Sequence, residues 1–549
     1  MTQPAVRATA PAAESRRFYS LSFWLLLLAF EAFVLSLPLF PTGDSGLHIY
    51  YATIFRDLLT HKSPLYAHFY AVRHVVQPYL LHYYVFIGLC TFLSPDAAEK
   101  ILVVVVLATL AFGFRNLVRS LSPDSPGLVL LIFPFLLNWP LSMGALNYTF
   151  ALGLMFFALG IYERLALPGP RAGRLWKFAG LLLLLVLSHP VPLLLLVCML
   201  GLDLLLRLWQ APARRAFWSS DHARILALVF SCVAFVIPVL IADKNQVGKT
   251  VSDIHFHSSY VRQILNASRL TMLYAAGIPG RLYNRAFTVL YPASLVIVIA
   301  SGFFRRLKAR TLTGFDRLAI FSVLFLLASL FAPFELNGSG FFSFRLWFPC
   351  WLLGIAACSG ALLGAKWNRA AAAYGIVLSL IVLGLAIHTL RPIAVRSAQI
   401  EHAPLPVGKA GLYVQSISGQ TASYGTTYPV YWWNGGRAFI THNDVMLNSA
   451  WLYLTIIPVE ENGQSGLLRD YTRLRATENP NELDFYFSQS PPEQRARALH
   501  DADFILFVDP RTKGADLPGL IRFTLEPFMS DWHCDLYGLY AICRKAQTA

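Results

Sequence analysis

The sequence is poor in charged residues. Only 14% of its 549 residues are Asp, Glu, Lys or Arg, whereas 56% are hydrophobic and the mean hydropathy is +0.53. Apolar runs close to the roughly 20 residues that cross a bilayer recur from residue 20 to residue 391. This composition excludes an ordinary soluble globular protein and indicates a membrane protein with several spans.

Motifs of several enzyme classes are also absent. The sequence has no GxxxxGK(S/T) phosphate-binding loop, which argues against ATP-driven transport, and no HExxH pair for a metalloprotease. Its seven cysteines include no CxxC pair, and five of them lie in apolar segments. The other two, Cys534 and Cys543, flank the turn-like stretch "DLYG", and they could form a disulfide in an oxidising compartment.

Acidic residues are fewer than basic ones, 30 against 45, which gives a net charge of +15. In a soluble protein this balance would suggest nucleic acid as a partner. Here most Lys and Arg stand in short loops between apolar runs, where they orient transmembrane helices. We therefore expect no nucleic-acid partner and expect membrane lipids around the chain.

The number of spans depends on how two apolar runs are interpreted. Residues 18–40 follow a pair of arginines but are long and lack a small-x-small cleavage site, so we expect a retained transmembrane helix. If residues 75–93 crossed the membrane, the basic loop from Arg305 to Arg317 would lie outside. Basic loops favour the cytoplasm, so we expect residues 75–93 on the outer surface, about eleven spans in all, and the C-terminus outside.

The character of the sequence changes after Leu390. Residues 392–549 contain no run of membrane length and alternate β-like stretches such as "DFILFVD" and "GLYAIC" with the helix-like "PPEQRARALH". We therefore predict two domains. Residues 1–391 form a mainly α, polytopic membrane helical bundle, and residues 392–549 form a soluble α/β or α+β domain outside the membrane.

The first outer loop, "GDSGLHIYYATIFRDLL", predicts an amphipathic helix that lies in the membrane interface. Arg56 and Asp57 fall off its apolar stripe, which is formed by Leu47, Tyr50, Tyr51, Ile54 and Leu58.

Asp44 stands near the start of this helix, and His48 lies one turn further on. A carboxylate in "GDSG" is typical of an N-cap, which satisfies the free amide groups of a helix start. At a membrane surface it could also act as a general base for an attacking hydroxyl. Both roles can coexist, and His48 would then orient Asp44 or the acceptor.

Other polar residues fall on the same predicted outer side. Arg345, in "FFSFRLWFP", could bind a lipid phosphate or serve as an interfacial anchor. Arg262 and Arg269 are seven positions apart and would share a helical face, either as a second phosphate-binding patch or as part of a solvated helix. His189 could line a pocket or cap the preceding helix by bonding its last carbonyls, and Glu335 could bind substrate or belong to a polar turn.

A metal site has weak support in the sequence. Asp253, His255 and His257 alternate as possible ligands on a strand, but no fourth ligand accompanies them. We therefore expect no metal ligands and no obligatory cofactor, with a divalent metal as the open alternative.

The N-terminal span, the acid in "GDSGLHIYYATIFRDLL", the interfacial helix, about eleven spans and an outer C-terminal domain together resemble the GT-C class of integral membrane glycosyltransferases. The resemblance is to bacterial members that use polyprenyl-phosphate sugars. It implies that Asp44, as the acid of the first outer loop, is the catalytic base of an inverting transfer. Many members carry a further acid in the second outer loop, where "WPLSMGALNY" offers only Asn138 and Asn147.

We expect, on this resemblance, a glycosyltransferase of the inner membrane with a polyprenyl-phosphate sugar as donor and a lipid or glycan hydroxyl as acceptor. Asp44 and His48 would be catalytic, and Arg345, Arg262, Arg269, His189, Glu335 and Asn147 would bind substrate. Two alternatives remain open: a multi-spanning transporter or lipid flippase, and an enzyme like an O-antigen ligase or polymerase.

Overall fold

The structure is a computed structural model of the whole chain, and the chain divides into two compact units. Unit 1 comprises Met1–Val34, Val103–Leu141 and Leu146–Ile387, and unit 2 comprises Leu35–Leu102, Ser142–Ala145 and His388–Ala549. The structure describes residues 13–43, 45–73, 79–165, 171–210, 229–230, 254–255, 289–332, 335–336, 342–360, 365–415, 435–447, 459–462, 492–508, 517–526 and 528–546.

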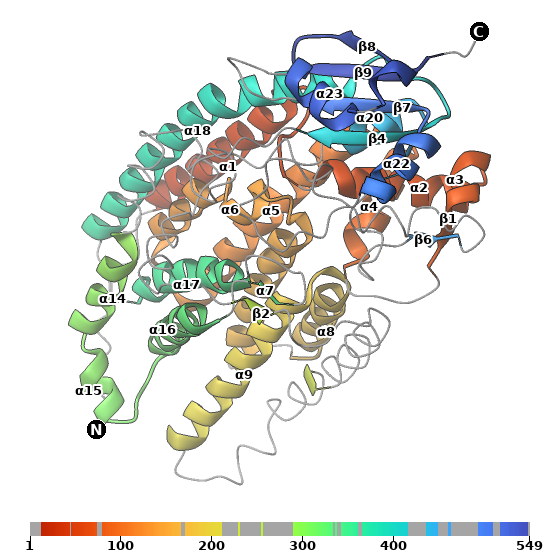
Figure 1. The fold of residues 1–549 in the computed structure, drawn as a ribbon. Coiled ribbons are helices and arrows are strands. Elements are labelled where there is room, and N and C mark those ends of the chain that lie inside the picture. Colours follow the sequence, from red (N-terminus) through yellow and green to blue (C-terminus); the bar gives the residue numbers. More distant parts are fainter. Residues whose placement is uncertain are drawn as a thin grey trace. The chain divides into compact units, whose positions relative to one another are not determined.

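Long apolar helices dominate the described residues, as Figure 1 shows. Six of them are long and apolar enough to cross a membrane, judged by length and composition. The predicted number of about eleven spans stays a prediction. The six helices are α1 (Ala13–Ser36), α5 (Pro95–Leu121), α7 (Leu146–Leu165), α9 (Pro190–Gln210), α16 (Gly314–Phe331) and α18 (Ala365–Glu401).

Shorter elements complete the described part of unit 1. The break between α8 and α9 falls at His189, because Pro190 can start a helix but cannot continue one. These elements are η1 (Pro126–Phe135), α6 (Trp139–Ser142, which ends in unit 2), α8 (Arg171–Ser188), α14 (Leu290–Ala300), α15 (Phe303–Lys308), α17 (Phe342–Cys358) and the strands β2 (Ile254–His255) and β3 (Glu335–Leu336).

Small residues let the helices of unit 1 approach closely. A Cβ added to Gly113 of α5 would lie 2.2 Å from the carbonyl oxygen of Gly153 in α7. Ser322 of α16 donates to the carbonyl oxygen of Cys350 in α17 at 2.7 Å and lies 2.8 Å from the hydroxyl of Tyr291 in α14. Close backbone contact and hydrogen bonds between helices are how membrane helices associate when apolar burial gives no advantage over lipid.

Unit 2 contains a five-stranded mixed sheet in the order β5-β4-β7-β9-β8. Strand β7 (Phe504–Val508) is buried at every position and pairs in parallel with β4 (Ala410–Gln415) and antiparallel with β9 (Tyr540–Lys545). The strands predicted at "DFILFVD" and "GLYAIC" are therefore confirmed. The remaining elements of this part are β5 (Val445–Met446), β8 (Trp532–Leu536), α20 (Gly435–Thr441), α22 (Pro492–Asp501), α23 (Leu517–Leu525) and η5 (Met529–Asp531).

The predicted disulfide is also confirmed. Cys534 and Cys543 are opposite each other on the antiparallel strands β8 and β9, and their sulfur atoms are bonded. A hairpin of these two strands brings the cysteines together in the way that their spacing around "DLYG" predicted.

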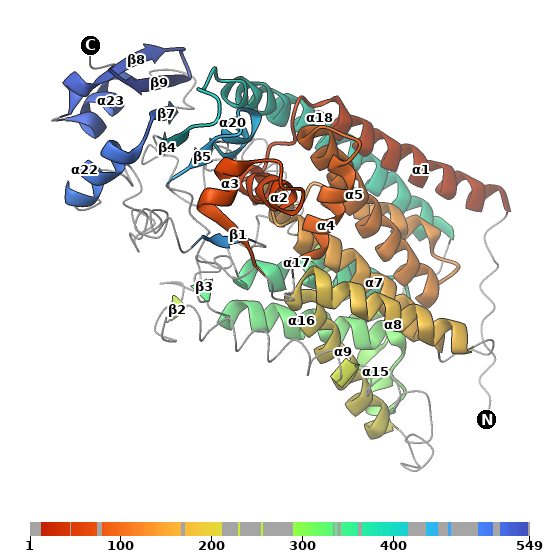
Figure 2. The same ribbon diagram turned by 90° about the vertical axis from the view of Figure 1, so that its right-hand side faces the viewer.

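Unit 2 also contains the first loop after α1. Its elements are α2 (Ser45–Leu59), α3 (Pro64–Phe69), β1 (Tyr70–Val72) and α4 (Leu81–Cys90). Strand β1 pairs antiparallel with β6 (Val459–Glu461), which comes almost 400 residues later in the chain. Figure 2 shows α2, α3 and β1 beside α20 and β5.

Candidate functional site

Helix α2 follows Asp44 directly in the sequence, and most of its predicted apolar stripe is buried: Leu47, Tyr50, Tyr51 and Ile54 completely, and Leu58 in part. Burial is not confined to that stripe, because Ile49, Ala52 and Phe55 are buried as well, so the one-sided pattern expected of an amphipathic helix is not found. Asp57, however, is 5% exposed, although the sequence placed it off the apolar stripe. It is buried because the neighbouring Arg56 donates to its carboxylate at 2.7 Å and compensates the charge.

His48 belongs to a small aromatic cluster between α2 and α4. Its Nδ1 lies 2.7 Å from the hydroxyl oxygen of Tyr83, and its ring meets that of His82 edge to face at 5.3 Å. Burial lowers the pKa of His48 to about 4 and also lowers the pKa of His82. His48 is therefore a neutral imidazole at neutral pH, suited to orient a partner by hydrogen bonding rather than to supply a positive charge.

A cavity of about 470 Å³ lies near the far end of α2. Its polar lining groups include Asp57, His61 and Ser63, and apolar side chains form the rest of the wall. Because α2 has 15 residues, the cavity is about 20 Å from the end of the helix that follows Asp44. The cavity is therefore separate from the start of α2.

A second cluster in unit 1 is centred on Tyr148. Its hydroxyl donates to the main-chain carbonyl of Arg345 at the start of α17, and its ring contacts the ring of His189 edge to face at 5.3 Å. The side-chain oxygen of Asn147 accepts the main-chain N–H of Tyr148 at 2.8 Å. Three residues predicted to bind substrate, Asn147, His189 and Arg345, are thus joined through a tyrosine that sequence reasoning missed.

The buried His189 lies at the turn between α8 and α9, and its hydrogen bonding explains its position there. Its Nδ1 accepts the main-chain N–H of Val191 at 3.1 Å, so the ring caps the first turn of the following helix, α9, whereas the sequence suggested a cap on the preceding helix. The ring then carries its own proton on Nε2. Asn138 has a similar structural role in this part of the chain. Its side-chain oxygen accepts the N–H of Leu141 at 2.9 Å, and its amide donates to the carbonyls of Phe135 and Leu136.

The remaining predicted residues are only partly described. Asp44, Arg262 and Arg269 lie outside the described residues. Glu335 lies on β3 directly opposite His255 on β2, so two candidates from distant parts of the sequence share one strand pair. No group of three His, Cys, Asp or Glu residues within the described ranges could hold a metal ion.

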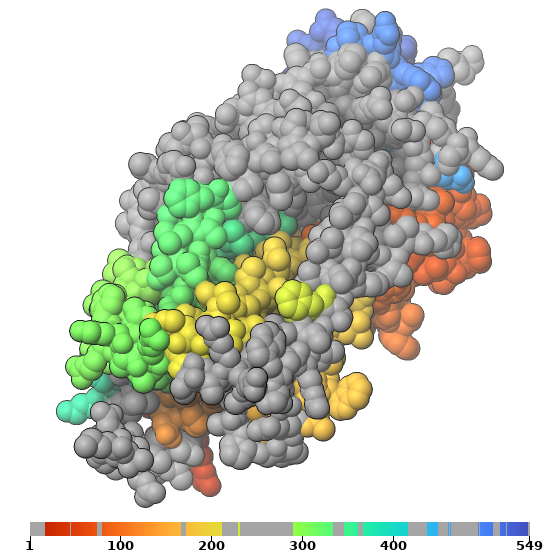
Figure 3. All heavy atoms as spheres, turned by 90° about the horizontal axis from the view of Figure 1, so that it is seen from below, coloured from red at the N-terminus to blue at the C-terminus, as the bar shows by residue number. Residues whose placement is uncertain are grey.

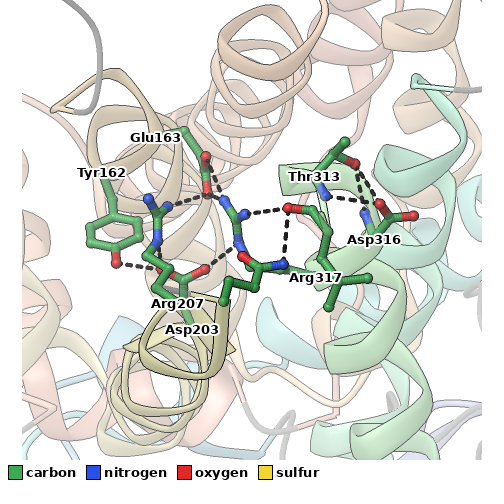
Figure 4. A network of polar contacts seen from close by, with 9 residues as sticks. Tyr162, Glu163, Asp203, Arg207, Thr313, Asp316 and Arg317 are labelled. Atoms are coloured by element: carbon green, nitrogen blue, oxygen red, sulfur yellow. Dashed lines mark hydrogen bonds and ion pairs between the residues drawn. The ribbon is translucent and has the colours of Figure 1, made fainter. Parts of the chain in front are cut away.

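Sequence reasoning missed a buried network of charges in unit 1, shown in Figure 4. Asp203 of α9 accepts a hydrogen bond from the Tyr162 hydroxyl at 2.6 Å and is ion-paired with Arg207 and Arg317. Arg317 of α16 also contacts Glu163 of α7 at 3.3 Å. Two carboxylates and two guanidinium groups therefore tie α7, α9 and α16 together, with no excess charge among these four groups.

The network adjoins the basic loop before α16. Thr313 and Asp316 form a capping box at the start of that helix, and Arg306 donates to both carboxylate oxygens of Asp316 at 2.7 and 2.8 Å. In Figure 3 the side chains of α9 (yellow) lie beside the green side chains of the segment from α14 to α16. The sequence signal for this network was the presence of Glu163 and Asp203 near the ends of predicted spans. A charge there is costly unless a partner compensates it, so each of these acids predicts a nearby cation.

Comparisons with known proteins were made at the levels of sequence and structure. No protein-family model matches the sequence, and no curated protein matches it either. The structure resembles that of ArnT from Cupriavidus metallidurans bound to undecaprenyl phosphate, with 12% identity and a TM-score of 0.54, over 98% of this chain and 99% of that one.

The apo structure of the same ArnT gives 11% identity and a TM-score of 0.43, over 97% of this chain and 98% of the other. The likeness to the lipid-bound structure extends over nearly the whole of both chains, so it concerns the complete architecture rather than one helical hairpin. The chain therefore has an ArnT-like fold, which agrees with the predicted mainly helical membrane bundle followed by a part that contains both helices and strands.

Proposed function

We propose that this protein is a membrane glycosyltransferase that transfers a sugar from a polyprenyl-phosphate donor to an acceptor hydroxyl. The observation that carries the proposal is the likeness to ArnT, whose structure was determined with undecaprenyl phosphate bound. An acidic residue just after the first span, in "GDSG", is the chemical feature that such a transfer requires.

In the proposed reaction the acceptor oxygen attacks the anomeric carbon of the donor from the side opposite the phosphate. Asp44 takes the hydroxyl proton as the new C–O bond forms. The bond between the anomeric carbon and the phosphate oxygen breaks, and the electron pair leaves with the polyprenyl phosphate. One displacement of this kind inverts the configuration at the anomeric carbon.

The other predicted residues have supporting roles in this proposal. Arg345, with Arg262 or Arg269, would stabilise the negative charge that grows on the departing phosphate. His48 would orient the acceptor or Asp44, which agrees with its neutral state and its hydrogen bond with Tyr83. His189, Glu335 and Asn147 would shape the substrate-binding surface. Proton transfer to Asp44 requires no metal, and treatment with a chelator tests this part.

We also propose that the C-terminal part of the chain lies outside the inner membrane, in the periplasm or an equivalent space. The Cys534–Cys543 disulfide supports this placement, because disulfides persist in oxidising compartments and are rare in the cytosol. The outer placement agrees with a donor carried by a lipid that delivers sugars to that side.

The test of the function is a transfer assay with purified protein in lipid nanodiscs. The protein is incubated with a panel of undecaprenyl-phosphate sugars, each radiolabelled in the sugar, and with a membrane lipid or glycan extract. We expect release of undecaprenyl phosphate from one donor together with label in the acceptor fraction. If every donor stays intact while labelled lipid moves between the leaflets of proteoliposomes, the transporter alternative replaces this proposal.

A further inference from the structure

The C-terminal part of the chain packs directly on the helix that follows the proposed base. A Cβ added to Gly436 of α20 would lie 2.7 Å from the carbonyl oxygen of Gly46 and 3.2 Å from Cβ of Tyr50. Both neighbours belong to the first turns of α2. At this point only a glycine permits the contact, because the nearest atoms are backbone atoms that have no rotamer with which to move away.

Two further contacts join the same parts of unit 2. The main-chain N–H of Met446 on β5 donates to the Tyr50 hydroxyl at 2.8 Å, and that hydroxyl lies 2.9 Å from the hydroxyl of Tyr70. Strand β1 then pairs with β6 through Tyr70, Ala71 and Val72. Elements α20, β5 and β6 therefore each contact the first loop.

Helix α20 is itself anchored. Arg437 is 2% exposed and ion-paired with Asp96, at 2.8 Å, and with Glu99, both in the first turns of α5. Burial lowers the pKa of Arg437, but the carboxylates of Glu99, Glu401 and Asp96 outweigh it and hold that pKa above its ordinary value. A permanently charged guanidinium that is ion-paired with two separate carboxylates anchors α20, so we expect a clash at Gly436 to displace α2 rather than α20.

The residues that flank Asp44 in the sequence make close contacts of their own. On the preceding side, the N–H of Gly43 donates to the carbonyl of Ser142 at 2.8 Å, and Thr42 is buried. On the following side, Gly46 lies against Gly436. Gly43 and Gly46 are three positions apart in the sequence, so both contacts lie close to Asp44 along the chain.

We propose that Gly436 and Arg437 are positioning residues for the transfer: they fix the start of α2, the helix that directly follows in the sequence the acid proposed to remove the acceptor proton. The proposal rests on the proposed function. It gives the C-terminal part of the chain a role in the reaction that is exerted through α2. A displacement of about 1 Å at a reacting group costs as much as 10²-fold in rate, so the precision of this contact matters for turnover more than for donor binding.

The experiment compares full-length variants in nanodiscs by transfer kinetics, by undecaprenyl phosphate binding and by hydrogen exchange of the peptide that covers the first turns of α2. Gly436→Ala should lower kcat by roughly 10²-fold, leave donor KM and lipid affinity within about twofold, and speed exchange at the start of α2. Arg437→Gln should have the same signature, and Arg437→Lys should restore part of the rate.

Gly88→Ala is the matched control, because a Cβ at Gly88 of α4 meets nothing within 4 Å. It should resemble the unchanged protein in all three measurements. If Gly436→Ala does not accumulate in folded form, Tyr50→Phe provides the test, since it removes only the hydroxyl that accepts from Met446 and lies 2.9 Å from the Tyr70 hydroxyl. Tyr50→Phe should then reduce kcat by roughly 5- to 30-fold, which corresponds to the loss of one or both of these neutral hydrogen bonds.

Two outcomes overturn the positioning role. One is unchanged kcat in Gly436→Ala and Tyr50→Phe, and the other is a rate loss in proportion to lost lipid binding and lost thermal stability. Asp44→Asn in the same assay distinguishes failure of the positioning role from failure of the proposed glycosyl transfer. If Asp44→Asn keeps full turnover, the proposed base is wrong, whereas an inactive Asp44→Asn beside a fully active Gly436→Ala refutes the positioning role alone.

Discussion

The hydroxyl of Tyr148 donates a hydrogen bond to the main-chain carbonyl of Arg345. The main chain at the start of α17 is thus held by a contact that does not involve the guanidinium group. The side chain of Arg345 can therefore be removed without loss of this contact, which allows its proposed phosphate role to be tested separately from the fold.

Arg345→Ala should weaken binding of undecaprenyl phosphate by roughly 10- to 100-fold and should lower turnover as well. A charge-assisted hydrogen bond contributes about 1.5–3 kcal/mol, and a phosphate contact acts in both the ground state and the transition state. Binding is measured by titration of the lipid into nanodisc-embedded protein. Lys308→Ala is the control, since Lys308 is an exposed cation of α15, and equal losses in both variants would mean general electrostatic attraction only.

Asp44→Asn should lower transfer by roughly 10²-fold or more, the usual effect of losing a general base. Asparagine is as good an N-cap as aspartate, so folding and donor binding should not change. Turnover and thermal melting are measured on the same preparation. Near-normal transfer with unchanged melting would leave Asp44 as a helix cap and nothing more. His48→Ala should have the smaller effect, because His48 is neutral and hydrogen-bonded with Tyr83.

Arg317→Gln should destabilise the helical bundle strongly. It removes the cation that joins Asp203 and Glu163, and breaking a buried ion pair by removing one partner costs about 3–5 kcal/mol. The melting temperature in detergent measures the effect. Pairing this variant with Glu163→Gln in a double-mutant cycle should recover part of the loss, whereas strictly additive losses would show that the two side chains do not interact.

Asp444→Asn should stabilise the protein at alkaline pH and have little effect at acidic pH. Burial raises the pKa of Asp444 to about 7, although its carboxylate accepts the N–H of Lys409 at 2.7 Å. The folded state thus binds a proton that the unfolded state releases near pH 4, and stability falls as the pH rises toward 7. Melting curves from pH 4 to pH 8 should show a gap of a few degrees that opens as the pH rises from about 4 to 7 and stays constant above that. A gap that does not depend on pH would contradict the raised pKa.

Cysteine labelling tests the orientation of the chain in the membrane. With a reagent that does not cross membranes, His500→Cys should be labelled in cells whose outer membrane is permeable, since that side chain is 87% exposed. Lys308→Cys, in the basic loop before α16, should react only after the inner membrane is opened. The reverse pattern would contradict the predicted topology and the outer position of the C-terminal part.

The sequence by itself determined the class of the protein and much of its local structure. Apolar runs, basic loops and the alternation in "DFILFVD" depend on neighbours within one helix or strand, so α7, α9, β7 and β9 could be predicted. The Cys534–Cys543 disulfide belongs to the same group, because a hairpin fixes its geometry over a few residues. Resemblance to the GT-C class added the overall architecture.

Only the tertiary structure decided which distant residues meet. The contact of Gly436 with Gly46 and the ion pairs of Arg437 with Asp96 and Glu99 join positions more than 330 residues apart. A single sequence carries no periodicity that records such a contact. The same reason explains why Tyr148 and the charges around Asp203 were missed: a tyrosine or a carboxylate in a span has many possible partners, and packing of separate helices selects one of them.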